Sequence, residues 1–183
     1  MDSIVVKQAV GVCALIVPWN FPLQMAAWKL APCLAAGNVA VFKPAEITPL
    51  TAIKLFEIIE RVQLPKGVCN LVLGSGQVIG DIMTSHPEVD KVSFTGGTET
   101  GKKVMTNALQ TMKKVTLELG GKSPIVVFPD TDLEKTAEYI LFAIFLGPGQ
   151  ICSAGSRVIV HESIAFELTS TLVKHTQNQL QQR

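Results

Sequence analysis

Short, largely apolar runs alternate with amphipathic segments along most of this chain, and that alternation is what most constrains the fold. The runs that read as strands are Cys13–Val17, Asn38–Phe42, Val68–Val72, Lys91–Phe94 and Val115–Glu118. Near-continuous apolar character is typical of parallel strands that are covered on both faces, whereas strands with one wet face alternate apolar and polar residues. The pattern therefore predicts an α/β protein with a mostly parallel sheet.

The segment between the second and third runs gives the clearest helix. Thr48 stands where an N-cap is expected, Pro49 occupies the first helical position, and the helix is predicted to run to Val62. Its predicted apolar face consists of Leu50, Ile53, Leu55, Phe56, Ile59 and Val62. Repeated strand–helix units of this kind give an open, doubly wound, Rossmann-like sheet, whose ligand site lies beyond the carboxyl ends of the strands.

The pattern changes after Gly120-Gly121. A further strand is predicted over 125–128, a helix over 133–145, a strand over 157–161 and a last helix after it. These elements indicate that one domain covers residues 1–120 and that a second α/β domain begins at residue 121.

Charge and hydropathy exclude several classes of partner. The chain has 16 basic and 15 acidic residues, interspersed, with a net charge of +1, so neither nucleic acid nor an anionic membrane is an expected partner. The longest apolar run, residues 139–146, is much shorter than the roughly 18 residues that span a bilayer. No basic segment followed by an apolar signal core opens the chain, which makes the cytoplasm the expected location.

The cysteines and histidines do not predict a metal site. The four cysteines are scattered without paired spacing, and the three histidines are far apart in the sequence. We expect Cys13, Cys33 and Cys69 to be small buried residues in a reducing compartment. Cys152 differs, because it lies in Gly149-Gln150-Ile151-Cys152-Ser153-Ala154, where small neighbours would let a thiol approach a carbonyl carbon. It is a candidate nucleophile, with a small buried apolar residue as the alternative.

Four motifs precede this cysteine in the sequence. They are Pro-Trp-Asn-Phe-Pro at 18–22, Lys-Pro-Ala-Glu at 43–46, Phe-Thr-Gly-Gly at 94–97 and Leu-Glu-Leu-Gly-Gly-Lys-Ser-Pro at 117–124. With the cysteine loop they make the chain resemble the NAD(P)-dependent aldehyde dehydrogenase superfamily, from about Gly11 to about Glu162. The resemblance implies a dinucleotide-binding domain over 1–120, without its N-terminal part, and the beginning of a catalytic domain over 121–183. The Cys-Ser-Ala-Gly-Ser-Arg run after Ile151 is similar to the betaine-aldehyde and aminoaldehyde branch.

The resemblance also implies catalytic roles. Cys152 would attack an aldehyde to form a thiohemiacetal, hydride would pass to the nicotinamide, and water would hydrolyse the resulting thioester. The Asn20 amide and the Cys152 backbone N–H would stabilise the oxyanion, and Glu118 would be the base for hydrolysis, its pKa raised by partial burial. The alternatives are that Asn20 only makes a turn between two prolines and that Glu118 only caps the turn at residues 120–121.

Cofactor contacts follow from the same resemblance. Lys43 and Glu46 would reach the adenosine ribose, and Glu46 would repel a 2′-phosphate, so NAD is favoured over NADP. A surface ion pair is the alternative for these two residues. Other residues expected at the cofactor are Trp19, Gly76, Gly80, Phe94, Thr95, Gly96, Gly97 and Leu119. Gly97 stands where serine is usual in the family, and Trp19 and Trp28 are expected to pack apolar surface, Trp19 also beside the aldehyde passage.

Two departures from the family bear on function. The family often has Asn where Gly147 stands, and the rigid Pro148 can alter the loop that presents Cys152. The later Glu-x-Phe motif that positions the nicotinamide ribose in the family does not occur here. The main hypothesis is thus an NAD-dependent enzyme that oxidises a small aldehyde to an acid, in a family of homo-oligomers. The alternative is a truncated, non-catalytic module that binds nucleotide or partner subunits.

Overall fold

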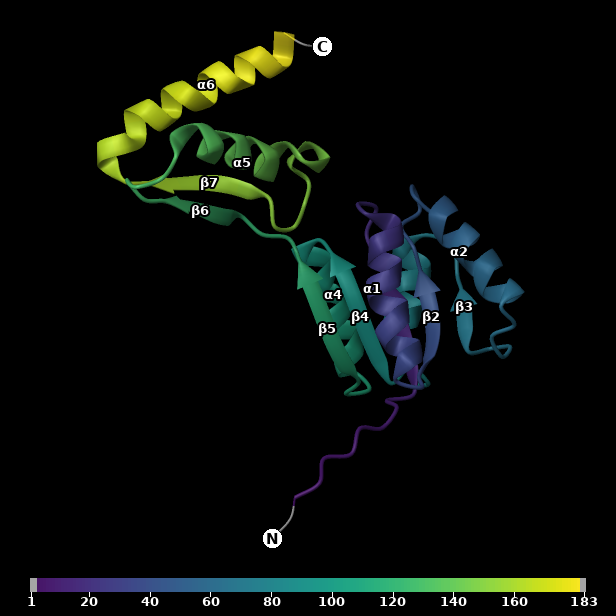
Figure 1. Ribbon diagram of the computed structural model, residues 1–183. Helices are drawn as coiled ribbons and strands as arrows, with labels where there is room; N and C mark the ends of the chain where they lie inside the picture. Colours follow the sequence, from purple (N-terminus) through teal and green to yellow (C-terminus); the bar gives the residue numbers. More distant parts are fainter. Residues whose placement is uncertain (1–2, 182–183) are drawn as a thin grey trace. The chain divides into compact units, whose positions relative to one another are not determined.

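The computed structural model describes residues 3–181. They form two compact units, which divide between Leu119 and Gly120. The first unit contains a five-stranded sheet with the strand order β3-β2-β1-β4-β5, in which every neighbouring pair is parallel (Figure 1). Its strands are β1 (Val12–Ile16), β2 (Val39–Lys43), β3 (Cys69–Leu71), β4 (Lys91–Gly96) and β5 (Lys114–Leu119).

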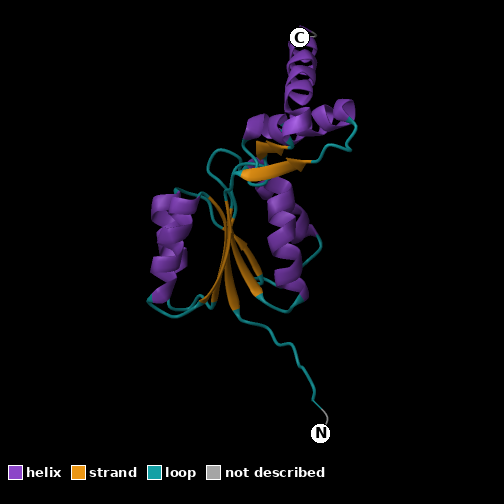
Figure 2. Cartoon of the chain, turned by 90° about the vertical axis from the view of Figure 1, so that its left-hand side faces the viewer, coloured by secondary structure: helices purple, strands orange, loops and turns teal. Residues whose placement is uncertain are grey.

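Helices cover both faces of this sheet, as Figure 2 shows with the sheet seen edge-on. On one face, α1 (Pro22–Ala35) and α2 (Leu50–Arg61) pack on alternate strand residues such as Leu15 and Phe42. On the other face, α3 (Asp81–Ser85) and α4 (Thr98–Leu109) pack on Ile16 and Val92. A sheet buried on both sides explains the near-continuous apolar runs. The predicted doubly wound parallel fold is confirmed.

The start of α2 differs from the prediction. The helix begins at Leu50, Pro49 is the N-cap, and no side chain caps it. The Thr48 hydroxyl is buried without a hydrogen-bond partner in the described part of the chain. Of the predicted apolar face, Leu55 and Phe56 pack on the core together with Ala52, whereas Leu50 and Val62 at its two ends are exposed. The predicted Thr48 cap is therefore wrong.

Three strands extend further than their apolar patterns indicate. β2 continues to Lys43, β4 to Gly96 and β5 to Leu119, since their backbones keep the parallel register beyond the last apolar run. Backbone hydrogen bonds do not depend on side-chain polarity, so a polar residue or a glycine can close a strand. The extension brings several of the motif residues into the ends of strands.

The second unit is smaller. Its strands β6 (Ser123–Val127) and β7 (Gly155–Val160) are parallel, and its main helices are α5 (Leu133–Phe145) and α6 (Ala165–Gln181). Val127, Ile140 and Leu168 form the centre of its core. The Asp132 side chain accepts a hydrogen bond from the Lys135 amide (3.2 Å) and so caps α5. Among residues 3–181, no helix has both the length and the apolar character needed to cross a membrane.

Candidate active site

The carboxyl ends of the five parallel strands bring the sequence motifs of the first unit to one edge of the sheet. Asn20 follows β1, Glu46 follows β2, Gly76 follows β3, and Gly97 follows β4. Glu118 is the second-to-last residue of β5. The strand order reverses direction between β1 and β4, which is where open α/β sheets form their ligand crevices. The predicted grouping of these motifs at one edge is therefore present.

A sharp turn between β1 and α1 holds Asn20. Phe21 has a left-handed backbone (φ 50°), and Pro22 begins the helix. This geometry reverses the chain within a few residues and leaves Asn20 half-buried. Trp19 and Trp28 are both exposed, Trp28 with 65% of its surface accessible. The expectation that Trp28 packs apolar surface is wrong for this chain, because it lies on the outer side of α1.

The loops after β2 and β3 meet through Glu46. The Gly76 N–H donates a hydrogen bond to Glu46 Oε1 at 2.7 Å. Gly76 begins a short π-helical segment, Gly76–Gly80, and the Ser75 hydroxyl caps it by accepting a hydrogen bond from the Val78 amide (3.2 Å). Sequence reasoning missed Ser75, although a serine immediately before a helical turn is a recognised cap signal.

Lys43 is buried rather than exposed. Its side chain is 3% accessible, and its ammonium donates to the Pro44 carbonyl at 3.3 Å. Burial lowers the pKa of Lys43, and the nearby charge of Glu46 partly opposes this shift. No salt bridge joins Lys43 to Glu46 in the described structure. The alternative of a surface ion pair is therefore wrong.

The end of β4 combines a core residue with two glycines. Phe94 is buried, and its ring lies so close to Gly96 that a Cβ there would come within 2.5 Å of it. Phe94 thus supports the backbone at Gly96 from inside the core. Gly97 precedes α4, has no side-chain cap and has open space where a Cβ would lie. Leu119 packs against Gly101 of α4 in the same way.

Glu118 is exposed, so the partial burial that we expected is absent. It lies opposite Thr95 in the β4–β5 register. Its charge acts on Lys29 of α1, which sequence reasoning missed. Burial lowers the pKa of Lys29 to about 8, and Glu118 partly offsets this shift. The Lys29 ammonium donates to the Ser93 hydroxyl at 2.8 Å. The sequence offered one signal of this partial burial, since Lys29 lies between Ala26 and Leu30, which are both buried residues of α1.

Cys152 lies in the second unit, in the loop between α5 and β7, and its thiol is exposed. Gly121 packs directly against it, because a Cβ at Gly121 would lie 3.1 Å from the Cys152 carbonyl oxygen. Gly147 and Gly149 have positive φ angles of 60° and 73°. Pro148 has φ 27°, far from the value of about −65° that its ring favours, so this loop is strained. The other cysteines are reduced; Cys13 and Cys33 are buried as expected, and Cys69 is half-buried.

The model of the aldehyde dehydrogenase family matches residues 1–182. The chain belongs to the aldehyde dehydrogenase family. It is 56% identical over 176 residues to aminoaldehyde dehydrogenase 1 of Pisum sativum, covering 96% of this chain and 35% of that protein. It is 52% identical over 173 residues to betaine aldehyde dehydrogenase of Bacillus subtilis, covering 94% of this chain and 35% of that protein.

Solved structures of this family have the same fold. Betaine aldehyde dehydrogenase of Staphylococcus aureus in complex with NAD+ matches with a TM-score of 0.93 and 46% identity, covering 97% of this chain and 37% of that one. A second structure of that enzyme with NAD+ gives a TM-score of 0.92. The chain described here spans about a third of the length of the curated relatives that it matches.

Proposed function

We propose that the residues of this chain serve NAD-dependent oxidation of a small aldehyde to a carboxylic acid. The observation that carries the proposal is that the motifs at or just after the carboxyl ends of all five strands lie at one edge of the sheet. The close match to an NAD+ complex over 97% of the chain supports it. When bound, the nicotinamide accepts the hydride that an aldehyde carbon loses on oxidation.

Cys152 is the proposed nucleophile. An aldehyde carbon does not release hydride until a fourth substituent makes it tetrahedral, and a thiolate supplies that substituent. The exposed thiol of Cys152, among small residues, leaves room for a carbonyl carbon to approach. Its sulfur would form the thiohemiacetal and, after hydride loss, would hold the acyl group as a thioester.

Asn20 and Glu118 are the proposed partners of Cys152. The Asn20 side-chain amide and the Cys152 backbone N–H would donate hydrogen bonds to the oxyanion of the tetrahedral centre, and such a donor typically contributes about 3 kcal/mol. Glu118 would take a proton from the water that attacks the thioester carbon, and the acid and the free thiol would then be released. The positions of both residues at strand ends support these roles.

The loops around Glu46 and Gly76 are the proposed cofactor site. The Glu46 carboxylate, fixed by the Gly76 N–H, would accept hydrogen bonds from ribose hydroxyls and would repel a 2′-phosphate, so we propose NAD rather than NADP. The open space at Gly97 would let a phosphate approach the first amides of α4. Lys43, whose side chain is buried, is the second residue proposed to contact the adenosine ribose.

The proposed substrates are aldehydes that carry an amino or quaternary ammonium group. Both curated relatives described above are named for such aldehydes. Trp19 and Phe21 expose aromatic surface in the turn that holds Asn20. Aromatic faces attract ammonium cations, with an energy of about 0.5–2 kcal/mol. These residues would therefore contribute to binding the cationic end of the substrate.

A non-catalytic, nucleotide-binding module is the second candidate function. The observation that favours it is that Glu118 and Cys152 are both exposed. A catalytic site gains much of its electrostatic power by excluding water, and these two side chains remain open to it. Under this candidate the chain binds NAD without turnover.

Thermal unfolding with and without NAD+ is the first test. Saturating NAD+ at 100 times its dissociation constant should stabilise the chain by about 2.7 kcal/mol, because only the folded state binds it. NADH formation with betaine aldehyde or an aminoaldehyde then separates the two candidates. Cys152→Ala should abolish NADH formation and retain the NAD+ shift, whereas the neighbouring Ser153→Ala should retain both. An active Cys152→Ala variant would exclude Cys152 as the nucleophile, and a shift without turnover would favour the second candidate.

A further inference from the structure

A polar contact joins α3 to α4 in the first unit. The Thr84 side chain is fully buried, with 1% of its surface accessible, and its hydroxyl accepts a hydrogen bond from Asn107 Nδ2 of α4 at 3.0 Å. The same Asn107 nitrogen donates to Asp81 Oδ1 at 3.3 Å. We call these three residues the α3–α4 joint. A buried hydroxyl that loses such a partner destabilises the structure around it, so the joint restrains both helices.

The joint extends to the π-helical segment Gly76–Gly80. The Thr84 hydroxyl donates to the Gly80 carbonyl at 2.8 Å, so this one group accepts from α4 and donates to the last residue of the segment. At the first residue of the segment, the Gly76 N–H donates to Glu46 Oε1 at 2.7 Å. The segment is therefore linked to Asn107 at one end and to Glu46 at the other.

The π-helical segment depends on its neighbours for its position. The segment and α3 contain five residues each, and helices this short are not stable alone in water. Ile79 and Met83 pack with Val104 of α4 in one core cluster. Apolar packing is non-directional, whereas a hydrogen bond requires a defined distance and angle. The joint thus adds a directional restraint between α4 and the segment.

We propose that Asn107, acting through Thr84, is a positioning residue for Glu46 in cofactor binding. This role rests on the proposed function, in which the Glu46 carboxylate accepts hydrogen bonds from ribose hydroxyls. By fixing the Gly80 end of the segment, the joint holds the Gly76 N–H where it orients that carboxylate. A side chain that is oriented before binding loses less conformational freedom when the ligand arrives. The joint therefore raises the affinity of the chain for NAD+.

Calorimetric titration of the full chain with NAD+ tests this role. Asn107→Ala and Thr84→Val should each raise the dissociation constant about fivefold or more, as expected for the loss of one hydrogen bond. Thr84→Ser keeps the hydroxyl and should bind within about twofold of the unchanged chain. If Thr84→Val does not fold, Asn107→Ala, at a half-buried residue, still decides the outcome.

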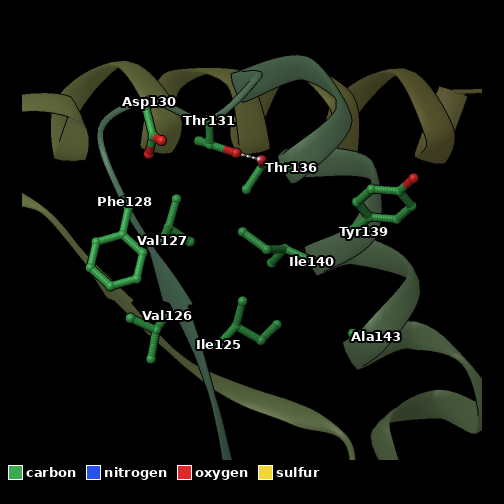
Figure 3. A pocket seen from close by; sticks show the side chains of 10 residues that line it. All are labelled: Ile125, Val126, Val127, Phe128, Asp130, Thr131, Thr136, Tyr139, Ile140 and Ala143. Carbon is green, nitrogen blue, oxygen red and sulfur yellow. Dashed lines mark hydrogen bonds between the residues drawn. The ribbon is translucent and has the colours of Figure 1, made fainter.

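Two variants are matched controls. Ser85→Ala removes a hydroxyl of α3 that donates to the Asp81 carbonyl of its own helix (2.8 Å). Thr136→Val removes a threonine hydroxyl of the second unit, which is hydrogen-bonded to the Thr131 hydroxyl at 2.7 Å (Figure 3). Neither side chain joins α3 to α4, so both variants should bind NAD+ within about twofold of the unchanged chain.

A double-mutant cycle with Glu46 separates positioning from a general loss of stability. Glu46→Ala removes the carboxylate, so adding Asn107→Ala should weaken NAD+ binding by less than about twofold more. Without NAD+, Asn107→Ala should speed hydrogen exchange about tenfold at the Ile79 amide, which donates to the Ser75 carbonyl at 2.9 Å.

Three results would overturn the proposal. One is full additivity of Asn107→Ala and Glu46→Ala, because Asn107 would then not act through Glu46. Another is an unchanged dissociation constant in Asn107→Ala, even with faster exchange at Ile79, because the joint would then be structural only. The third is a lack of NAD+ binding by the unchanged chain, which would remove the proposed cofactor site itself and the role of Asn107 with it.

Discussion

At the scale of single residues, the candidate site depends on contacts between residues that lie far apart in the sequence. Gly121 lies against the Cys152 carbonyl, Gly76 donates to Glu46, and the half-buried Lys29 donates to Ser93. Each contact joins residues that are 30 or more positions apart in the sequence. Substitutions at these positions therefore test the tertiary arrangement more directly than substitutions of the catalytic residues.

Gly121→Ala should impair turnover without unfolding the chain. The new methyl group would lie 3.1 Å from the Cys152 carbonyl oxygen and would displace the loop by a few tenths of an ångström. Because catalysis depends on the precise placement of the thiol, we expect NADH formation to fall about tenfold, or about 1.4 kcal/mol in the barrier. Gly120→Ala is the matched control, since a Cβ there has no neighbour within 4 Å. Equal rates for the two variants would contradict this prediction.

Lys29 should make stability depend on alkaline pH. Its pKa is lowered to about 8 in the folded chain from 10.5, so between these values the unfolded chain binds more protons than the folded chain. The free energy of unfolding therefore rises as the pH increases from about 8 to about 10.5, and the cost of burying the charge is fully present below pH 8.

Lys29→Met removes this titration. From pH 7 to pH 10, the unchanged chain should gain about 2 kcal/mol of stability relative to the variant, as measured by urea unfolding at both pH values. Lys43 and Lys113 also have lowered pKa values, but they titrate in both proteins and cancel in the difference. Lys103→Met, at an exposed residue of α4, is the control. A difference that does not change with pH would show that Lys29 is not buried as described.

At the scale of the elements, a buried asparagine joins the end of α1 to the start of β1. Asn38 Oδ1 accepts hydrogen bonds from the amides of Val10 (2.6 Å) and Gly11 (3.1 Å). Its Nδ2 donates to the carbonyl of Cys33 (3.1 Å), a buried residue near the end of α1. Asn38 thus fixes the strand–helix unit whose opposite end carries Asn20.

Asn38→Ala should lower the free energy of unfolding by about 2–3 kcal/mol, because it leaves buried backbone groups without partners. Urea unfolding followed by tryptophan fluorescence measures this, since Trp19 and Trp28 both lie in the affected strand–helix unit. Gln110→Ala, at an exposed residue that follows α4, should cost less than about 0.5 kcal/mol. A loss at Asn38 as small as that at Gln110 would show that water replaces the side chain.

At the scale of the whole molecule, the candidate residues belong to two compact units. Asn20, Glu46 and Glu118 lie in the first unit, and Cys152 lies in the second. The proposed cofactor contacts come from the first unit, and a ligand stabilises only the structure that binds it. The two units should therefore respond differently to NAD+.

Hydrogen exchange should show this difference. Saturating NAD+ should slow exchange in the strand ends and loops of residues 3–119, and it should leave the amides of β6, α5 and α6 nearly unchanged. Amide exchange rates depend on the free energy of opening of each part of the structure, so one experiment compares the stabilities of the two units. Equal slowing in both units would mean that they unfold as one cooperative body. Proteolysis at Lys122, which follows the junction between the units, gives an independent measurement.

The amino-acid sequence by itself determined the parallel α/β class, because apolar runs without alternation fit only strands covered on both faces. It also determined the family, since the motifs and the Cys152 loop occur in a fixed order, and it placed the motifs at the strand ends. The family match confirms that resemblance. These properties follow from local composition and from the spacing of motifs, both of which can be determined from the sequence directly.

Only the tertiary structure decided which residues meet. It decided the strand order, the burial of Lys43 and the partial burial of Lys29. It also decided the Asn38 hydrogen bonds and the contact of Gly121 with Cys152, which join distant segments. The predicted Thr48 cap failed for the same reason, because packing buried its hydroxyl away from the helix start. The identity of a polar residue does not tell whether its side chain faces water or the core. That is decided only when the sheet and the helices pack together.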